Sequence, residues 1–156
     1  MLRLPRSAVR PTSDWSRDRM THYVNPDREN FEAFKALPRD VPIQLLNLVR
    51  YRDLAAYPQG HPQAETGWSG QRAFAEYFAR LVPVIDKLGG GMVWEGRFEG
   101  VITGPAEFEW DRVFVMGFPS ANAFLAMVTD PYYKAEVVPH RTAAVLDSRL
   151  VRYGAV

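Results

Sequence analysis

The sequence predicts an α+β protein with the ferredoxin-like, or split βαβ, topology. Segments of strand and helix character follow one another in the order strand, helix, strand, strand, helix, strand. Two principal helices are enough to cover one face of a four-stranded antiparallel sheet. The length of 156 residues is typical of one domain with a substantial core.

The first 40 residues are expected to lie outside the main domain. Residues 1–19 carry five arginines but neither apolar periodicity nor the apolar stretch of a signal peptide, which predicts a disordered extension. Met20 is a plausible alternative start. Residues 20–40 predict a short appended helix, with Asn25 as its N-cap, Pro26 at its first position and Pro38 ending it.

The domain over residues 41–156 begins with a strand, 41–51, that is apolar on both faces. A long loop, 52–70, follows, and connections of this length are usually functional or mobile. Ser69 can cap the next helix, whose apolar residues recur with the 3.6-residue period up to Leu88. Pro83 inside this helix predicts a kink.

The second half of the domain repeats the pattern of strand and helix. A strand at 92–98, expected to continue to 103, is joined by a hairpin connection to another two-sided strand at 112–118. A helix capped by Ser120 restarts at Asp130 and bends at Pro139. Asp147 and Ser148 are predicted to turn the chain into a last strand at 149–153.

Strands that are apolar on both faces predict an interface, because two helices cover only one face of the sheet. The economical cover for the other face is the same sheet of a second copy. We therefore expect a homodimer through facing sheets.

Composition narrows the class of protein. The sequence has no cysteine, which excludes disulfides and thiolate chemistry, and it gives no sign of export, so a cytoplasmic protein is expected. No apolar run is long enough to predict a membrane span. Outside the basic first 19 residues the chain is slightly acidic, and nucleic-acid binding is not expected.

Three stretches carry a family resemblance: LLNLVRYRD with the following YPQG, SGQRAFAEYFARLVPVIDKLGG, and VMGFPSANAFLAMVTDPYYKAEVVPHRTAAVLDSRLV. Together, over residues 41–153, they resemble the uncharacterised bacterial family known as domain of unknown function 1330, in the dimeric α/β-barrel superfamily. The resemblance implies a dimeric α/β barrel. The superfamily includes cofactor-free monooxygenases, lactone isomerases, haem-degrading enzymes and peroxidases, but also ligand-binding modules, so it implies no single reaction.

The closing helix carries the candidate catalytic pair, Glu136 and His140. Four residues apart, they share one face of a regular helix, so the carboxylate could orient the imidazole as a general base. Arg141 beside them could hold an anionic group of a substrate. The alternative is a solvated salt-bridge face without chemistry.

Three further residues are candidates for substrate binding. Asn47 interrupts an apolar strand and could bond a ligand carbonyl, or it could tie down the loop that follows. Tyr77 and Trp94 could face one another and line an apolar pocket, or simply pack in the core. His61 could be a lid residue or an exposed loop histidine. No paired-histidine motif is present, so neither a metal nor another cofactor is expected.

These observations leave three functions open. The first is a cofactor-independent enzyme, monooxygenase- or isomerase-like, acting on a small apolar or aromatic substrate between sheet and helices under a loop lid. The second is a module that binds a small ligand without turnover. The third is a purely structural dimer.

Overall fold

The computed structural model describes residues 22–156, so the expected extension over residues 1–19 and the alternative start at Met20 lie outside it. The main domain is built of β1 (Ile43–Tyr51), α3 (Gly70–Lys87), β2 (Gly91–Arg97), β3 (Arg112–Phe118), α4 (Ala121–Thr129), the π-helical turn η2 (Tyr133–Val137), α5 (Val138–Ala144) and β4 (Val145–Tyr153). A short helix, α2 (Arg28–Ala36), precedes it.

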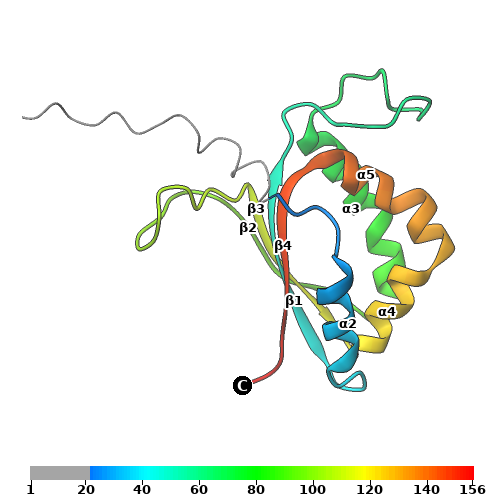
Figure 1. The fold of residues 1–156 in the computed structure, drawn as a ribbon, viewed down its shortest axis with the longest axis vertical. Coiled ribbons are helices and arrows are strands. Elements are labelled where there is room, and N and C mark those ends of the chain that lie inside the picture. Colours follow the sequence, from blue (N-terminus) through cyan, green and yellow to red (C-terminus); the bar gives the residue numbers. More distant parts are fainter. Residues whose placement is uncertain (1–21) are drawn as a thin grey trace, which may run out of the picture.

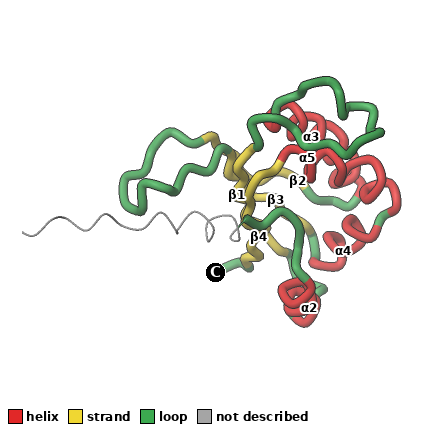
Figure 2. The backbone as a smooth tube through the Cα atoms, turned by 45° about the horizontal axis from the view of Figure 1, so that its top comes forward, coloured by secondary structure: helices red, strands yellow, loops and turns green. Residues whose placement is uncertain are grey.

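The four strands form one antiparallel sheet in the order β2-β3-β1-β4, and the helices all lie on one side of it (Figures 1 and 2). This order and the βαββαβ connectivity are those of the ferredoxin-like fold, so the predicted topology is confirmed. None of the helices in residues 22–156 combines the length and apolar character that crossing a bilayer requires.

Helix caps explain where the helices begin. The side chains of Ser69 and Ser120 accept hydrogen bonds from backbone N–H groups of α3 and α4, as predicted. The predicted cap of α2 is wrong: Asp27, not Asn25, occupies the N-cap position. The Asp27 carboxylate accepts from both the backbone and the side-chain nitrogen of Asn30, at 2.8 and 2.7 Å, which fixes the start of the helix two residues later than expected.

The core lies between the sheet and the helices. Alternate residues of β1 and β3 point into it, and the aromatic ring of Phe74 on α3 sits at its centre with 1% exposure. Four other rings pack around Phe74, those of Tyr51, Tyr77, Phe78 and Phe114. α3 runs through Pro83 as a single helix.

The last strand begins earlier than predicted, because α5 leads into β4 without an intervening residue. Asp147 and Ser148 are buried within the strand instead of forming a turn. The segment before α2 satisfies their polar groups: the backbone N–H of Tyr23 donates to Asp147 Oδ1 at 2.8 Å, and Ser148 N donates to Tyr23 O at 2.7 Å. Asp147 and Ser148, which are common in turns, thus lie within a strand because Tyr23 provides hydrogen-bond partners for their buried polar groups.

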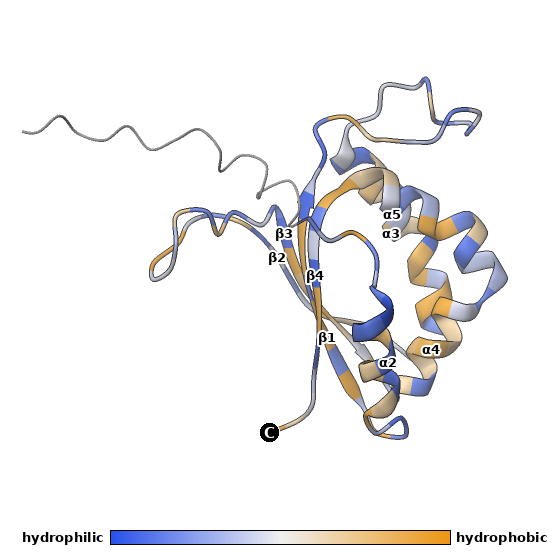
Figure 3. Ribbon diagram, viewed as in Figure 1, coloured by the Kyte–Doolittle hydropathy of each residue, from blue (hydrophilic) through white to orange (hydrophobic). Residues whose placement is uncertain are grey.

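On the opposite side of the sheet, which we call the open face, residues 22–156 place no helix (Figure 1). The strands contain many apolar residues, orange in Figure 3. Those whose side chains lie on the open face are Leu46 and Leu48 of β1, Val113 and Val115 of β3, Val93 and Trp94 of β2, and Val151 and Tyr153 of β4. The predicted extension of β2 to residue 103 is wrong, because the strand ends at Arg97. Residues 98–111 instead form an arm that projects on the side of the open face (Figures 1 and 2).

Candidate functional site

His140 is a buried histidine held by a residue far away in the sequence. Its side chain, on α5, is 3% exposed. Its Nδ1 atom lies 2.7 Å from the hydroxyl oxygen of Tyr57, which belongs to the long loop after β1. The hydrogen bond therefore links the closing helix to the loop across 83 residues of sequence.

The first part of the loop, residues 52–56, is its stem, and it is fixed to the body of the protein, meaning the sheet and the helices that cover it. The backbone nitrogens of Arg52 and Ala56 donate to the last carbonyls of α5, those of Ala144 and Ala143, each at 2.8 Å. Those carbonyls would otherwise lack partners at the helix end. Tyr57 follows directly on this stem, so its ring has a rigid base beside His140.

The tip of the loop, residues 58–67, is bonded mainly to itself. The backbone nitrogens of His61, Ala64 and Thr66 donate to carbonyls within the tip, at 3.1, 2.9 and 3.3 Å. Two glycines with left-handed backbones, Gly60 and Gly67, stand near its two ends at φ 90° and 69°. The tip is therefore a small unit bonded mainly to itself, with Gly60 inside its first turn and Gly67 at its end.

Aromatic rings fill the space between tip and helices. The ring of His61 stacks on Tyr57 with centroids 4.6 Å apart, and it meets His140 edge to face at 5.6 Å. Trp68 packs its edge against Tyr57 at 6.2 Å. His61 and Tyr57 are half-buried, whereas His140 lies beneath them.

Alternating charges from α3 and η2 surround the aromatic cluster. Glu76 accepts from Arg80 at 3.0 Å and lies 3.4 Å from Arg72. Arg80 also reaches Glu136, at 3.6 Å. The hydrogen bond from Arg80 is the main cause that lowers the pKa of Glu76, so this carboxylate is ionised at neutral pH. Two guanidinium groups thus face two carboxylates, and the group has no net charge.

The pKa of His140 is lowered, first by burial and then by the charge of Arg80, while Glu76 opposes the shift. Burial likewise raises the pKa of Tyr57. His140 is therefore a neutral imidazole at pH 7, with the charge of Glu76 close enough to favour its protonated form. Such a group can accept a proton and later return it.

Glu136 does not bond to His140 but is exposed and pairs with Arg80. Glu136 lies in the π-helical turn η2, and His140 lies in the helix α5 that follows it. The carboxylate of Glu136 is instead 3.6 Å from a guanidinium nitrogen of Arg80, on α3. Tyr57 takes the place at His140 for which the sequence suggested Glu136.

Arg141 and Tyr77 belong to a different part of the structure. Arg141 donates to the backbone oxygen of Val24 and, at 3.3 Å, to Ser148 Oγ, so it ties the segment before α2 to β4. Tyr77 is buried in the core against Phe74 and Phe78. Burial raises its pKa well above the usual range.

Asn47 and Trp94 also lie away from His140. Asn47 faces the helices, half-buried, and its Nδ2 donates to Leu45 O at 3.1 Å. Trp94 pairs with Val115 beyond a register shift in β2 and stands 55% exposed on the open face. Tyr77 and Trp94 thus lie on opposite sides of the sheet and line no common pocket.

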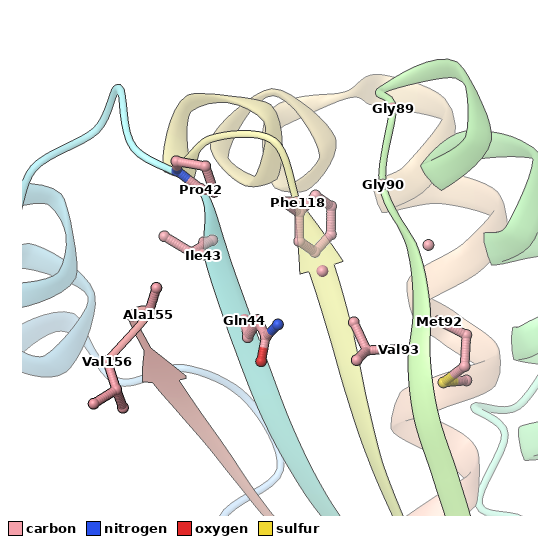
Figure 4. A pocket seen from close by; sticks show the side chains of 13 residues that line it. Pro42, Ile43, Gln44, Gly89, Gly90, Met92, Val93, Phe118, Ala155 and Val156 are labelled. Atoms are coloured by element: carbon pink, nitrogen blue, oxygen red, sulfur yellow. The ribbon is translucent and has the colours of Figure 1, made fainter.

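Two surface depressions are also present. One, of about 670 Å³, lies at the end of the sheet between the start of β1 and the start of β2, with Gln44, Val93 and Phe118 among its lining residues (Figure 4). The other, of about 460 Å³, is lined by Tyr51 and Arg112 together with residues of β2. Neither includes His140. Residues 22–156 contain no cluster of three metal-ligating side chains.

Comparison with known proteins agrees with the fold. The chain is similar to the protein RPA0582, of unknown function, from Rhodopseudomonas palustris, with 43% identity over 87% of this chain and 98% of the other, and a TM-score of 0.78. The structure of methylated RPA0582 gives 44% identity, coverage of 88% and 97%, and a TM-score of 0.79. A search of the curated proteins found no match. Residues 64–153 match the model of a domain of unknown function, DUF1330. This match confirms the resemblance predicted from the sequence, and the chain belongs to the DUF1330 family.

Proposed function

We propose that this protein is a cofactor-independent enzyme in which His140 moves a proton on a small molecule bound beneath the tip of the loop. The observation that carries the proposal is the buried, neutral imidazole of His140, held at Nδ1 by the hydroxyl of Tyr57. The proposed site lies between this loop and helices α3 and α5, rather than between sheet and helices.

Tyr57 determines which tautomer of His140 acts as the base. In the tautomer that the reaction needs, Nδ1–H of His140 donates to the Tyr57 oxygen, which leaves the lone pair of Nε2 free to accept a proton. Nδ1–H keeps its acceptor when the ring becomes charged. Glu76 favours the charged ring, which offsets part of the cost of charging a buried group.

The simplest reaction for such a base is an isomerisation. Nε2 takes a proton from a carbon next to a carbonyl group, and the electron pair of the broken C–H bond moves toward the carbonyl oxygen. While the intermediate is bound, the proton on Nε2 exchanges with solvent; Nε2 then returns a proton, either to a different atom, which completes the isomerisation, or to the original carbon, which exchanges its hydrogen. The reaction conserves atoms and electrons and needs no co-reactant.

Exchange of substrate hydrogen for solvent deuterium tests this proposal. Small enolisable ketones and lactones, incubated with the protein in D₂O, should gain deuterium at the carbon next to the carbonyl. His140→Ala should lower the exchange rate by about 10²–10⁴-fold, the usual contribution of a general base. The matched control is His22→Ala, because His22 is an exposed histidine. Equal exchange by wild type and His140→Ala would exclude His140 as the base.

The closed loop favours one second candidate, a module that binds a ligand without turnover. With His61 and Tyr57 both packed against its ring, His140 is only 3% exposed. A binding module would retain its ligand tightly in native mass spectrometry and show no deuterium exchange in any variant.

We also propose that the protein is a homodimer through its open face. Support comes from the apolar side chains of that face, of which Val93, Trp94 and Tyr153 are each 55% exposed. A face of this kind at the surface of a sheet is best covered by an identical, self-complementary face. Analytical ultracentrifugation should give a dimer for wild type and a monomer for Val115→Glu, which charges the middle of the face. Lys134→Glu, on the helical side, should leave the dimer intact. A wild-type protein that is monomeric would exclude the proposed dimer.

A further inference from the structure

We infer that His61 stands in for the ligand: the site beneath the loop tip takes a neutral, planar ring molecule with a weakly acidic hydrogen, such as a phenol, which has the form of the enol of a cyclic ketone, in the place that the His61 ring occupies. This inference rests on the proposed function, because it places the ligand against His140. It adds the chemical class of the ligand and the movement that admits it.

One ring covers both groups that a substrate must reach. The imidazole of His61 lies flat on Tyr57, at 4.6 Å and an interplanar angle of 18°, and it also packs against the edge of His140. Removing this single ring would expose a flat aromatic face and the base beside it. The space left has the shape of the ring that filled it, which favours a planar molecule.

The His61 ring is bound to the body of the protein by packing alone. Within residues 22–156 its hydrogen bond is to the tip itself, where Gln63 N donates to His61 Nδ1 at 3.1 Å. Leaving the site therefore breaks ring contacts but no hydrogen bond to the body. The nearby glycines Gly60 and Gly67 already adopt left-handed backbones, and a side chain at either would meet open space. A tip whose hydrogen bonds are mainly internal, and which ends at Gly67, can swing out as one unit without breaking them.

The charges around the site favour a neutral ligand. Glu76 is paired with Arg72 and Arg80, and Arg80 is also paired with Glu136. Arg72 lies in addition over the ring of Trp68, at 4.2 Å. An anionic ligand would have to compete with carboxylates already in place, and a cationic ligand with guanidinium groups. A neutral ring that donates one hydrogen bond to Nε2 of His140 meets neither cost.

The test uses three ring probes of different charge, phenol, benzoate and benzylamine, at pH 7.5. Their affinities for wild type, His61→Ala and His61→Phe are measured by NMR from the side-chain resonances of His140 and Tyr57. His61→Ala opens the space, whereas His61→Phe refills it with a ring of similar shape. Thermal unfolding verifies that each variant is folded.

Phenol should bind His61→Ala about tenfold more tightly than wild type or His61→Phe, since an aromatic contact with each of two rings no longer has to be displaced. Benzoate and benzylamine should bind His61→Ala at least about tenfold more weakly than phenol, because of the paired charges. Equal phenol affinity in His61→Ala and His61→Phe, or benzoate binding as tight as phenol, would overturn the inference.

Wild type supplies an independent measurement should His61→Ala fail to fold. The nuclear Overhauser effect between the rings of His61 and Tyr57 should disappear on saturation with phenol; its persistence would overturn the inference. No proton transfer takes part in these experiments. A protein that binds phenol in this way but gives no deuterium exchange keeps this inference and loses the proposed function, and the opposite result does the reverse.

Discussion

The hydroxyl of Tyr57 offers the most direct test of the proposed site, because Tyr57→Phe removes one oxygen and leaves the ring. The ring contacts of Tyr57 with His61, Trp68 and His140, at 4.6, 6.2 and 5.5 Å, remain possible for phenylalanine. What disappears is the 2.7 Å hydrogen bond to Nδ1 of His140. The variant therefore isolates one interaction.

The size of the effect follows from burial. His140 is 3% exposed, so its Nδ1 has little access to water once the hydroxyl is gone. A buried polar atom that loses its partner costs about 1–3 kcal/mol. Tyr57 itself is half-buried, and water near the loop can recover part of this, so we expect the free energy of unfolding to fall by about 1–1.5 kcal/mol.

Urea denaturation of the two proteins at pH 7.5 measures this difference, provided that the dependence on urea concentration stays the same. Tyr132→Phe is the matched control, since Tyr132 is 51% exposed and should change stability by less than about 0.5 kcal/mol. Adding His140→Leu to both proteins completes a double-mutant cycle, in which a coupling of about 1 kcal/mol is expected. A Tyr57→Phe protein as stable as the control variant would refute the assigned hydrogen bond.

Three further predictions concern stability. The pKa of His140 in the folded protein lies below its ordinary value, so below about pH 6.5 the unfolded chain binds more protons than the folded one, and the free energy of unfolding should fall by at most about 1.4 kcal/mol per pH unit. His140→Gln should remove this contribution of His140 when stability is measured from pH 8 to pH 5. The same pH dependence in wild type and His140→Gln would contradict the prediction. Gly70→Ala should cost about 3 kcal/mol in urea denaturation, because the new Cβ would lie 2.1 Å from the backbone oxygen of Arg52, whereas Gly100→Ala meets nothing within 4 Å and should be neutral. Ser69→Ala should cost about 1 kcal/mol by loss of the α3 cap; no change in the urea midpoint would mean that the cap is dispensable.

The fold could be predicted from the sequence because its signals are local. Serine caps, the 3.6-residue period of α3 and the apolar strands each act over a few neighbouring residues. The start of the last strand was predicted wrongly because a distant partner decides it. Asp147 and Ser148 resemble a turn until Tyr23, more than 120 residues away, satisfies them within a strand.

The candidate site could be predicted only in part for the same reason. His140 was identifiable as a chemically useful residue, but its partner Tyr57 lies in a loop and carries no periodic signal. The spacing of Glu136 and His140 suggests a shared helix face, but it carries no information on Arg80 of α3, with which Glu136 pairs instead. A register shift in β2 similarly decides that Trp94 faces away from Tyr77.

The direct passage from α5 into β4 limits how the length of this chain can vary. One extra residue between Ala144 and Val145 would either shift β4 against β1, which exchanges the two faces of the strand, or pull α5 away from the loop stem. His140, near the end of α5, would be displaced in the second case. Insertions and deletions should instead be tolerated in the loop tip at 58–67 and in the outer part of the arm at 98–106, before Glu107 and Glu109 accept hydrogen bonds from Arg50. Changes in the length of the loop tip can therefore alter what covers the proposed site, while His140 beneath the tip stays in place.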